Sequence, residues 1–369
     1  MPGALVIGGT GPTGPHVVGG LIDRGFDVTV LHRGVHEPGG LPDVAHIHAD
    51  PHFPETLRAG VGQRDFELVL AMYGRVRAIA DTFDGRCGQL VAVGGVPVYL
   101  GCIDPERNRP YGMRLPAREE GPLADQGDVV PTFSELVLGA ERSVLDAVRS
   151  YKSGVVRYCG IYGPRNVLPW EWSIVRRVLD GRTRMIIPDH GLGIISRCAA
   201  RNAAAIVLGV VDHPDVANRQ AYNCADDDQF SFLQWTEAVL DILGAEIELV
   251  SVPSDLARSA FAELPPPGGR PHIVVDNAKA KRDLAYREVV PAVAALEEAV
   301  HWLLANPVTP EAYPMYRASF DYATEDRLID AYRAARDWVL EQVPDEPPDL
   351  AHPMPHPQAP GLSVDQRGR

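Results

Sequence analysis

Short apolar runs alternate with helix-like segments along the first 165 residues of the chain. Strands that are rich in Val, Leu and Ile on both faces, and that are separated by helices, indicate a parallel sheet covered on both sides. The pattern therefore predicts a doubly wound α/β fold with a parallel sheet in residues 1–165. The predicted strands are Ala4–Gly9, Asp27–Arg33, His46–Asp50, Phe66–Met72, Gln89–Gly95 and Gly154–Gly163.

The pattern changes after Gly163, where Pro-rich turns lead into amphipathic helices. Residues 166–306 are predicted to form mainly a smaller C-terminal substrate lobe, with some segments returning to the first lobe. In this part "QAYNCAD" predicts a strand, and "SFLQWTEAVLDILG" predicts a helix with Ser231 as its N-cap. Residues 307–343 are predicted to be a helical extension, and the Pro-rich, aperiodic residues 344–369 a disordered tail.

A glycine-rich loop follows the first predicted strand and opens a helix. In "IGGTGPTG", Gly8, Gly11 and Gly14 have GxxGxxG spacing. The first glycine permits a tight turn, the second lets the backbone approach a pyrophosphate, and the third lets the helix pack closely on the strand. The helix N-terminus then directs its dipole at the phosphates. We expect a dinucleotide to bind here, the alternative being a plain glycine-rich turn.

The end of the second predicted strand bears on the choice of cofactor. An NAD site usually has an Asp or Glu there, about 20 residues beyond the glycines, to bind the ribose 2′-hydroxyl. This chain has "LHRG", with His32 and Arg33 and no carboxylate. Because arginine pairs well with a phosphate, NADP(H) is predicted over NAD(H). In the alternative interpretation, Arg33 only ends the strand in solvent.

Composition narrows the class of protein. With 45% hydrophobic and 23% charged residues the chain is typical of soluble globular proteins, and no apolar run approaches the roughly 18 residues of a membrane span. The formal charge of −14 disfavours nucleic acid. No basic stretch precedes the first apolar run, so no signal peptide is expected. Five scattered cysteines and twelve histidines without metal-ligand spacing predict no disulfide framework, no metal and a cytoplasmic location.

The order of several motifs resembles the extended short-chain dehydrogenase/reductases, the NAD-dependent epimerase/dehydratase family. The motifs are the glycine loop, "VAVGGVPVYLG", the "AE" of segment 133–148, "VVRYCGIYGP" and "AYNCADDDQFSF". The resemblance covers residues 4–306 and includes the lysine-rich "HIVVDNAKAKRDLAYRE". It implies a Rossmann lobe, a smaller substrate lobe and a cleft between them. The cofactor contacts expected are Gly8, Thr10, Gly11, Pro12, Thr13, Gly14, Arg33, Asp50, Ala71 and Tyr158.

The resemblance fails at the residues that carry the family's chemistry. That chemistry uses a Ser or Thr and a Tyr-x-x-x-Lys pair, in which the Tyr exchanges a proton with the substrate. Aligned on Tyr99, the hydroxyl position is Gly95; aligned on Glu141, the Tyr and Lys positions are Phe133 and Val137. The helix 133–148 carries an apolar stripe at these positions, at Phe133, Val137, Ala140, Val144 and Val148, which favours a real loss over a misalignment.

Substitute catalytic groups are few. Tyr99, after the fifth strand, and Tyr111, in a polar loop of the region that contacts substrate in the family, are the candidate proton donors; a packed Tyr99 and a surface Tyr111 are the alternatives. The resemblance places Asp50 near adenine, and Tyr158 and Cys159 beside the nicotinamide. Trp170 and Trp172 could supply an aromatic wall for a flat substrate, the alternative being core packing of one and exposure of the other. His190 and Arg197 could meet an anionic or polar ligand, but neither is selected as a site residue.

The predicted function is an NADPH-dependent reductase of a small-molecule ketone, acting without the usual Tyr/Lys pair. Losing a general acid costs about 10²–10⁴ in rate, which is tolerable when the ketone lies beside a phenol that stabilises the oxyanion. Such aromatic or polyketide-like substrates suggest secondary metabolism. The alternatives are a non-redox isomerase, cyclase or lyase that keeps a bound nucleotide, and a non-catalytic NADP-binding protein. No nucleic-acid or membrane partner is expected, and a homodimer is left open.

Overall fold

The computed structural model describes residues 1–34, 40–146, 148–256, 272–309, 320–343 and 359–362. Met1–Tyr322 form one compact unit and Ala323–Arg369 a second. The helical extension predicted for residues 307–343 contains helix α10, Tyr322–Gln342. Most of the tail predicted for residues 344–369 lies outside the described residues. No helix in the described part of the chain is long and apolar enough to cross a membrane.

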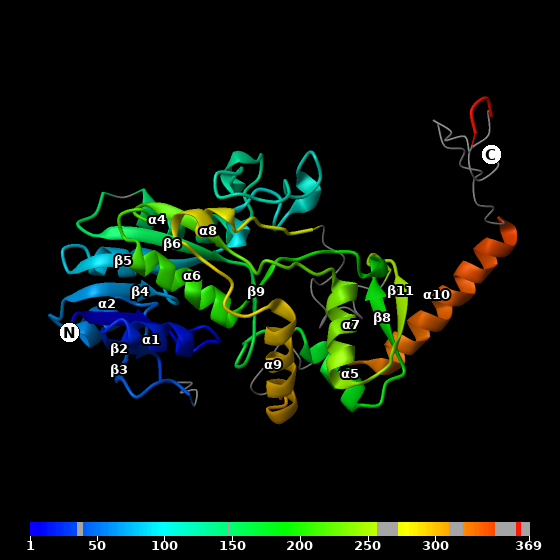
Figure 1. Cartoon of the computed structure of the whole chain (residues 1–369), viewed down its shortest axis with the longest axis horizontal. Helices are drawn as coiled ribbons and strands as arrows, with labels where there is room; N and C mark the ends of the chain where they lie inside the picture. Colours follow the sequence, from blue (N-terminus) through cyan, green and yellow to red (C-terminus); the bar gives the residue numbers. More distant parts are fainter. Residues whose placement is uncertain (35–39, 147, 257–271, 310–319, 344–358, 363–369) are drawn as a thin grey trace. The chain divides into compact units, whose positions relative to one another are not determined.

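The centre of the first unit is a seven-stranded sheet in which every pair of neighbours is parallel (Figure 1). The strand order is β10-β6-β5-β4-β1-β2-β3, which confirms the predicted doubly wound fold. The strands are β1 (Gly3–Ile7), β2 (Asp27–His32), β3 (Ala45–His48), β4 (Phe66–Ala71), β5 (Cys87–Gly95), β6 (Lys152–Tyr158) and β10 (Gln220–Cys224).

Both faces of the sheet are apolar because successive residues of each strand alternate between two helix layers. Ala4 and Val6 of β1 pack with α1 and α6, whereas Leu5 and Ile7 pack with α2, α3 and α4. Strands buried on both faces explain the continuous apolar runs in the sequence. The covering helices are α1 (Gly14–Asp23), α2 (Pro54–Val61), α3 (Val76–Thr82), α4 (Thr132–Leu145) and α6 (Ala200–Asp212).

Two predicted elements differ in extent from the structure. The single strand predicted at Gly154–Gly163 is divided: β6 ends at Tyr158, and β7 (Gly160–Tyr162) pairs with β9 (Arg197–Ala199) outside the main sheet. The helix predicted to reach Val148 ends at Leu145, and Val148 is 90% exposed. In both cases the apolar residues of the sequence continue beyond the last residue of the element, because the neighbouring element against which it packs ends earlier.

The chain after Gly163 forms a smaller part and also returns to the sheet (Figure 1). β10 adds to the edge of the sheet beside β6, while β8 (Arg184–Pro188) pairs with β11 (Glu248–Val252). In helix α7 (Phe232–Leu243), the Ser231 side chain accepts the Gln234 N–H and the Gln234 side chain accepts the Ser231 N–H, confirming the predicted N-cap. The other helices here are α5 (Trp172–Leu179), α8 (Ala278–Asp283) and α9 (Ala292–Ala305).

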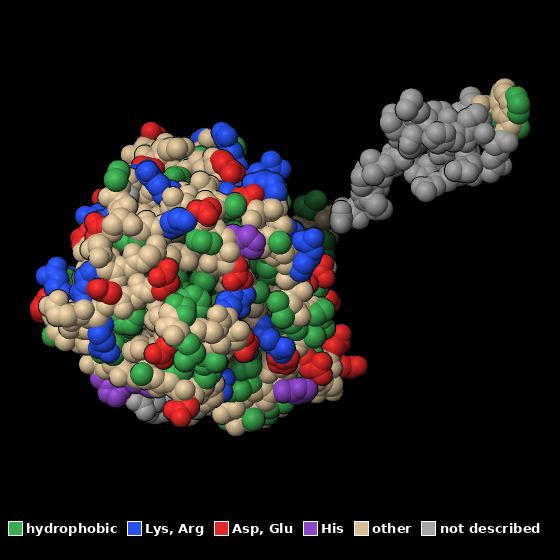
Figure 2. Space-filling view, turned by 60° about the vertical axis from the view of Figure 1, so that its left-hand side comes forward, with side chains coloured by type: hydrophobic (Ala, Val, Ile, Leu, Met, Phe, Trp, Pro, Cys, Tyr) green, Lys and Arg blue, Asp and Glu red, His purple; other side chains and the backbone are tan. Residues whose placement is uncertain are grey.

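On the face shown in Figure 2, acidic and basic side chains are interspersed among apolar ones rather than gathered by sign. A nucleic-acid interface would present clustered Lys and Arg side chains.

Candidate functional site

The loop between β1 and α1 makes the tight turn that its glycine spacing predicts. Gly8 has a φ of 99° and Gly9 a φ of 72°, values that glycine adopts without strain. A Cβ on Gly14 would lie 1.8 Å from the carbonyl oxygen of Gly9. Glycine at position 14 therefore lets α1 begin directly against the turn, as its place in the spacing requires.

The start of α1 suits an anionic group. No described heavy atom outside its immediate chain neighbours lies within 4 Å of where a Cβ on Gly11 would stand. No side chain in the described part of the chain caps α1, whose N-cap is Thr13. The positive end of the helix dipole favours phosphate at such a position, although the Gly14 N–H already donates to the Gly11 carbonyl oxygen at 3.1 Å. Thr10 and Pro12, on the same loop, are partly exposed, although Pro12 has no N–H to donate. The loop thus fits a dinucleotide pyrophosphate.

A polar and aromatic cluster lies at the carboxyl ends of β2, β3 and β4. The Arg33 guanidinium stands 5.5 Å from the centre of the Tyr73 ring, and the His52 ring meets Tyr73 edge-on at 4.7 Å. Asp50 accepts hydrogen bonds from the backbone N–H and Nδ1 of His52, both at 2.9 Å. The backbone bond is the main cause of a lowered Asp50 pKa, and the charge of Arg33 acts in the same direction. Arg33 and Asp50, predicted separately, therefore belong to one cluster.

Ala71 and Tyr158 end strands β4 and β6 at the same edge of the sheet. Ala71 is fully buried and pairs with Ile7 and Ala92. Burial raises the pKa of Tyr158, and the neighbouring Thr13 side chain opposes that rise. Tyr158 therefore lies beside the N-terminus of α1, next to the glycine loop. Burial also raises the pKa of the adjacent Cys159 thiol, which keeps that thiol protonated near neutral pH.

The three positions aligned with the family's catalytic groups line one cavity. Gly95, Phe133 and Val137 border a space of about 330 Å³ between β5, α3 and α4. The rest of the lining is mainly aliphatic, and its one ionisable side chain is Glu141. Phe133 is 57% exposed, so it stands at the mouth of the cavity. A wall of this kind can bind an apolar ligand, but its described lining offers no hydroxyl or amine for proton transfer.

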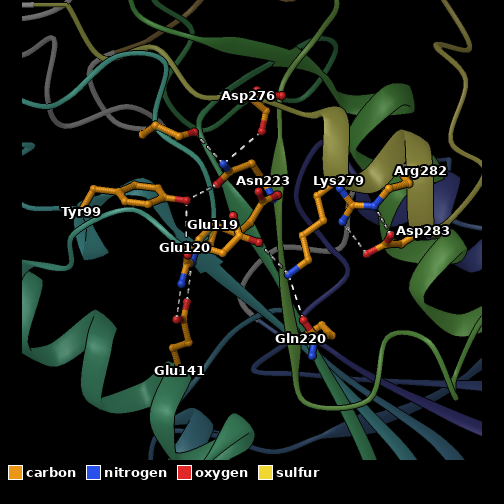
Figure 3. Close-up of polar contacts among 12 residues, drawn as sticks. Tyr99, Glu119, Glu120, Glu141, Gln220, Asn223, Asp276, Lys279, Arg282 and Asp283 are labelled. Carbon is orange, nitrogen blue, oxygen red and sulfur yellow. Dashed lines mark hydrogen bonds and ion pairs between the residues drawn. The ribbon is translucent and has the colours of Figure 1, made fainter.

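Tyr99 lies in the interior, at the centre of a hydrogen-bonded network (Figure 3). Its hydroxyl donates to Oδ1 of Asn223 at 2.7 Å and accepts from Nη1 of Arg157 at 2.8 Å. Arg157 also donates to both carboxylate oxygens of Glu141, at 2.9 and 2.7 Å. Burial is the main cause that raises the pKa of Tyr99 to about 12. Tyr99 thus joins strand β6, helix α4 and strand β10 through polar contacts.

The same network extends to the loop that precedes α4. Oε1 of Glu119 accepts the backbone N–H of Asn223 at 2.7 Å, and burial raises the pKa of Glu119. The Asn223 side-chain amide donates to the carbonyl oxygens of Ala117 and Asp276. Lys279 donates to Oε1 of Gln220 at 2.9 Å (Figure 3). These bonds fix the loop against β10.

A second cavity, of about 410 Å³, lies over this loop. Its lining includes Tyr99, Met113, Arg114 and Glu120, but Tyr111 is not among the residues that border it. Tyr111 is 55% exposed on the loop. The structure thus separates the two predicted proton donors: Tyr99 is held inside the protein and Tyr111 faces solvent.

The remaining candidates for substrate contacts are either buried, as are Arg197 and Trp172, or at least partly exposed, as are Trp170 and His190. Arg197 is buried, forms an ion pair with Glu171 at 3.0 Å, and lies 4.0 Å from the centre of the Trp235 ring, so its charge is satisfied internally. Trp172 is 2% exposed; Trp170 is partly exposed and lies under Arg197 at 5.1 Å. His190 is exposed in a turn with a φ of 60°.

Sequence reasoning missed the residues that complete these sites. Tyr73 and His52 both follow strands of the sheet, so their position at its carboxyl edge was a usable signal. Glu119 and Asn223 carry no comparable signal, because each lies in a segment that is far in sequence from its partner. The hydrogen bond from the Tyr99 hydroxyl to Asn223 could not be predicted without the placement of β10.

Solved structures with the same fold include sugar-nucleotide enzymes. A dTDP-glucose 4,6-dehydratase from Bacillus anthracis, in complex with NAD, has a TM-score of 0.63 and 16% identity, covering 85% of this chain and 100% of that one. A UDP-glucose 4-epimerase from Thermotoga maritima has a TM-score of 0.65 and 17% identity, over 82% and 99%. The dTDP-glucose 4,6-dehydratase DesIV from Streptomyces venezuelae, with NAD bound, has 0.63 and 18%, over 85% and 99%.

At these identities the likeness shows the fold alone. It agrees with the expected doubly wound α/β fold. No protein-family model matches the sequence, and no curated protein matches it either.

The exposure of Phe133 leads to a prediction about stability. We expect Phe133→Ala to lower the free energy of unfolding by no more than about 1 kcal/mol, because a surface-side ring leaves little cavity behind. Leu138→Ala is the matched control on the same helix: Leu138 is 3% exposed, so its truncation should cost about 2–5 kcal/mol. Urea denaturation measures both. Equal losses would show that the Phe133 ring is buried in solution.

The Tyr99 network leads to a second prediction. Tyr99→Phe removes one donor and one acceptor from buried partners and should cost about 1–3 kcal/mol of unfolding free energy. Since the pKa of Tyr99 is raised to about 12, the hydroxyl stays protonated between about pH 6 and 9, and the shape of any pH–activity profile should not change. Tyr111→Phe, at an exposed position, is the control and should leave stability unaltered. A Tyr99→Phe variant of normal stability but without activity would instead identify a proton donor.

Proposed function

We propose that the protein binds NADP(H) and reduces a small-molecule ketone without a Tyr/Lys acid–base pair. The observation that carries the proposal is the pairing of a phosphate-compatible glycine loop with Arg33, at the end of a β2 strand that has no carboxylate there. A bound nicotinamide would supply the hydride. The chain's own residues bind the cofactor and shape the cavity in which the ketone is oriented.

The preference for NADP(H) rests on the charge at the end of β2. The Arg33 guanidinium forms a planar fork that can donate two parallel hydrogen bonds to a 2′-phosphate. Its stacking on Tyr73 at 5.5 Å restricts the side chain near that position, which lowers the entropy lost on binding. An NAD site would instead use a carboxylate, which the 2′-phosphate would repel.

The choice of substrate follows from the cavity beside Gly95. Phe133, Val137 and their aliphatic neighbours favour a flat, apolar ligand. Because this lining carries no proton donor, the ketone has to stabilise its own developing oxyanion. A hydroxyl group on an adjacent aromatic carbon does this by an internal hydrogen bond, and water completes the protonation. The substrate class is therefore an aryl ketone with a neighbouring phenol, as in polyketide-like secondary metabolites.

The two tyrosines take different roles in this proposal. Tyr99 acts as a positioning residue, because its hydroxyl is shared between Arg157 and Asn223. Tyr111 is exposed on the loop after β5 and borders neither of the two cavities, so the proposal assigns it no proton transfer. The barrier is lowered mainly by orientation of the ketone and by its internal hydrogen bond.

A non-redox reaction is the second candidate function. The observation in its favour is the cavity lining itself, whose one ionisable group, Glu141, is held by Arg157. Such a site could bind an apolar substrate for isomerisation, cyclisation or elimination while a nucleotide serves a structural role. A non-catalytic NADP-binding protein would share the same cofactor contacts.

The cofactor assignment predicts the outcome of a titration. Wild-type protein should bind NADP(H) more tightly than NAD(H), and Arg33→Ala should weaken NADP(H) binding about 10- to 150-fold, corresponding to about 1.5–3 kcal/mol for charged hydrogen bonds. NAD(H) affinity should change little. Arg58→Ala, which removes an exposed arginine from α2, is the matched control. Isothermal titration calorimetry with both cofactors measures this, and equal affinities in the wild type would contradict the assignment.

The reductase proposal predicts a difference between two matched substrates. With NADPH, an aryl ketone that carries an adjacent phenol should be reduced about 10²–10⁴ times faster than its methyl ether, which lacks the internal hydrogen bond. The loss of reduced-nicotinamide absorbance and product analysis measure the reaction. Product without net cofactor oxidation would favour the non-redox candidate. Binding of NADP(H) with neither outcome, across a panel of such ketones, would favour the non-catalytic one.

A further inference from the structure

Three histidines meet on one face of the sheet, at the edge formed by β2 and β3. In the parallel pairing of these strands, Val30 is opposite His46 and His32 is opposite His48. Paired residues point to the same face of a sheet, as do residues two apart in one strand. Ile47, between the two β3 histidines, packs on the opposite face with α2 and α3. The register therefore gathers all three imidazoles on one side.

The distances between these rings are short. One ring nitrogen from each of His32, His46 and His48 lies within 4.8 Å of the others. Nε2 of His32 is 2.8 Å from Nδ1 of His46. The His32 ring centre is 5.1 Å from that of His46 and 4.9 Å from that of His48, with interplanar angles of 85° and 76°. The three nitrogens thus converge on one small volume.

Burial gives this cluster a closed and an open side. His32 is 5% exposed, whereas His46 and His48 are exposed. A ligand held between the rings would therefore rest on His32 and face solvent past the other two. Arg33, one residue on, belongs to the cluster of Tyr73, His52 and Asp50.

We propose that His32, His46 and His48 form a binding site for a divalent transition-metal ion of the zinc class. Imidazole nitrogens suit Zn²⁺, Cu²⁺ and Ni²⁺, and three protein ligands leave a fourth tetrahedral position for water on the solvent side. Zn–N bonds of about 2.0–2.1 Å place the ligand nitrogens about 3.3 Å apart, so the widest pair has to close by at most about 1.5 Å. Rotation of the exposed His46 and His48 rings supplies this movement.

Metal binding shifts one proton within His32. The Gly34 backbone N–H donates to Nδ1 of His32 at 3.1 Å, so in the metal-free state the ring proton is on Nε2 and is shared with Nδ1 of His46. Coordination through Nε2 removes the proton from this nitrogen and places one on Nδ1, leaving the ring neutral. The Gly34 amide must then turn away from Nδ1. Gly34 has a φ of 75° and glycine's freedom to do so.

Spacing along the sequence does not predict a three-ligand site here. His46 and His48 alone make a two-ligand H-x-H pair, and His32 lies 14 residues before the first of them. Only the register of β2 on β3 brings the third ligand into place. The expectation that no metal binds was based on linear spacing and does not take account of this pairing.

Calorimetric titration of the metal-free, nucleotide-free protein with Zn²⁺ alone tests the proposal. We expect one Zn²⁺ per chain and no detectable Mg²⁺ binding, since a site of three nitrogens does not suit a hard oxygen-seeking cation. His46→Ala and His48→Ala should each weaken Zn²⁺ binding by at least tenfold. His301→Ala, which removes an exposed histidine from α9, is the matched control and should bind as the wild type does.

Replacement of Zn²⁺ by Co²⁺ supplies a second readout. Tetrahedral Co²⁺ with nitrogen ligands gives visible d–d absorption, which should appear in the wild type and in His301→Ala and should be lost in His48→Asn. Because His48 is exposed, this variant should keep the wild-type circular dichroism spectrum. Absence of Zn²⁺ binding, or equal binding in all variants, would overturn the proposal and leave a hydrogen-bonded histidine cluster. Neither outcome depends on whether the protein is an NADP(H)-dependent reductase.

Discussion

The buried ion pair between Arg157 and Glu141 is the interaction on which the geometry of the candidate active site depends. Both side chains are almost fully buried, at 3% and 4% exposure, and they share two hydrogen bonds. Removing both charges from water is costly, so such a pair is stable only when its remaining donors are also satisfied. Arg157 meets this condition by donating to Tyr99 and to the Glu119 carbonyl oxygen. Loss of either partner would leave an isolated buried charge, at about 3–5 kcal/mol.

This ion pair also sets the shape of the apolar cavity. It attaches α4, which carries Phe133 and Val137, to β6, next to the β5 strand that ends at Gly95. The cavity wall carries the aromatic and aliphatic side chains of Phe133 and Val137, and the ion pair supports the helix behind that wall. A fold can therefore keep its scaffold while the chemistry at the site changes. This is the physical basis for proposing a substrate that brings its own oxyanion stabilisation.

The opposite half of the sheet depends on backbone geometry more than on side chains. The turn at Gly8 and Gly9, and the close contact of Gly14 with Gly9, place the start of α1 at the carboxyl edge of β1. The side chains of Arg33, Tyr73 and Asp50 gather at the ends of β2, β3 and β4. The likeness to sugar-nucleotide dehydratases and epimerases is a likeness of fold. It does not extend to these side chains or to the cavity lining, which have to be read from this chain itself.

The sequence by itself determined that the strands are buried on both faces, where the glycine turn lies and how α7 is capped, since each depends on the local pattern of residues. Apolar runs identify strands buried on both faces, GxxGxxG spacing requires a tight turn, and Ser231 with Gln234 forms a local capping box. Only the tertiary structure decided the rest. Helical periodicity placed Phe133 on the apolar stripe of α4, but the stripe cannot show where the packing layer ends, and the ring is exposed. Tyr99 is enclosed by Asn223, from a strand that is 124 residues away in sequence, and His32 reaches His46 and His48 only through the register of two parallel strands. Contacts of this kind depend on how separate elements pair and pack, which the local pattern of residues does not specify.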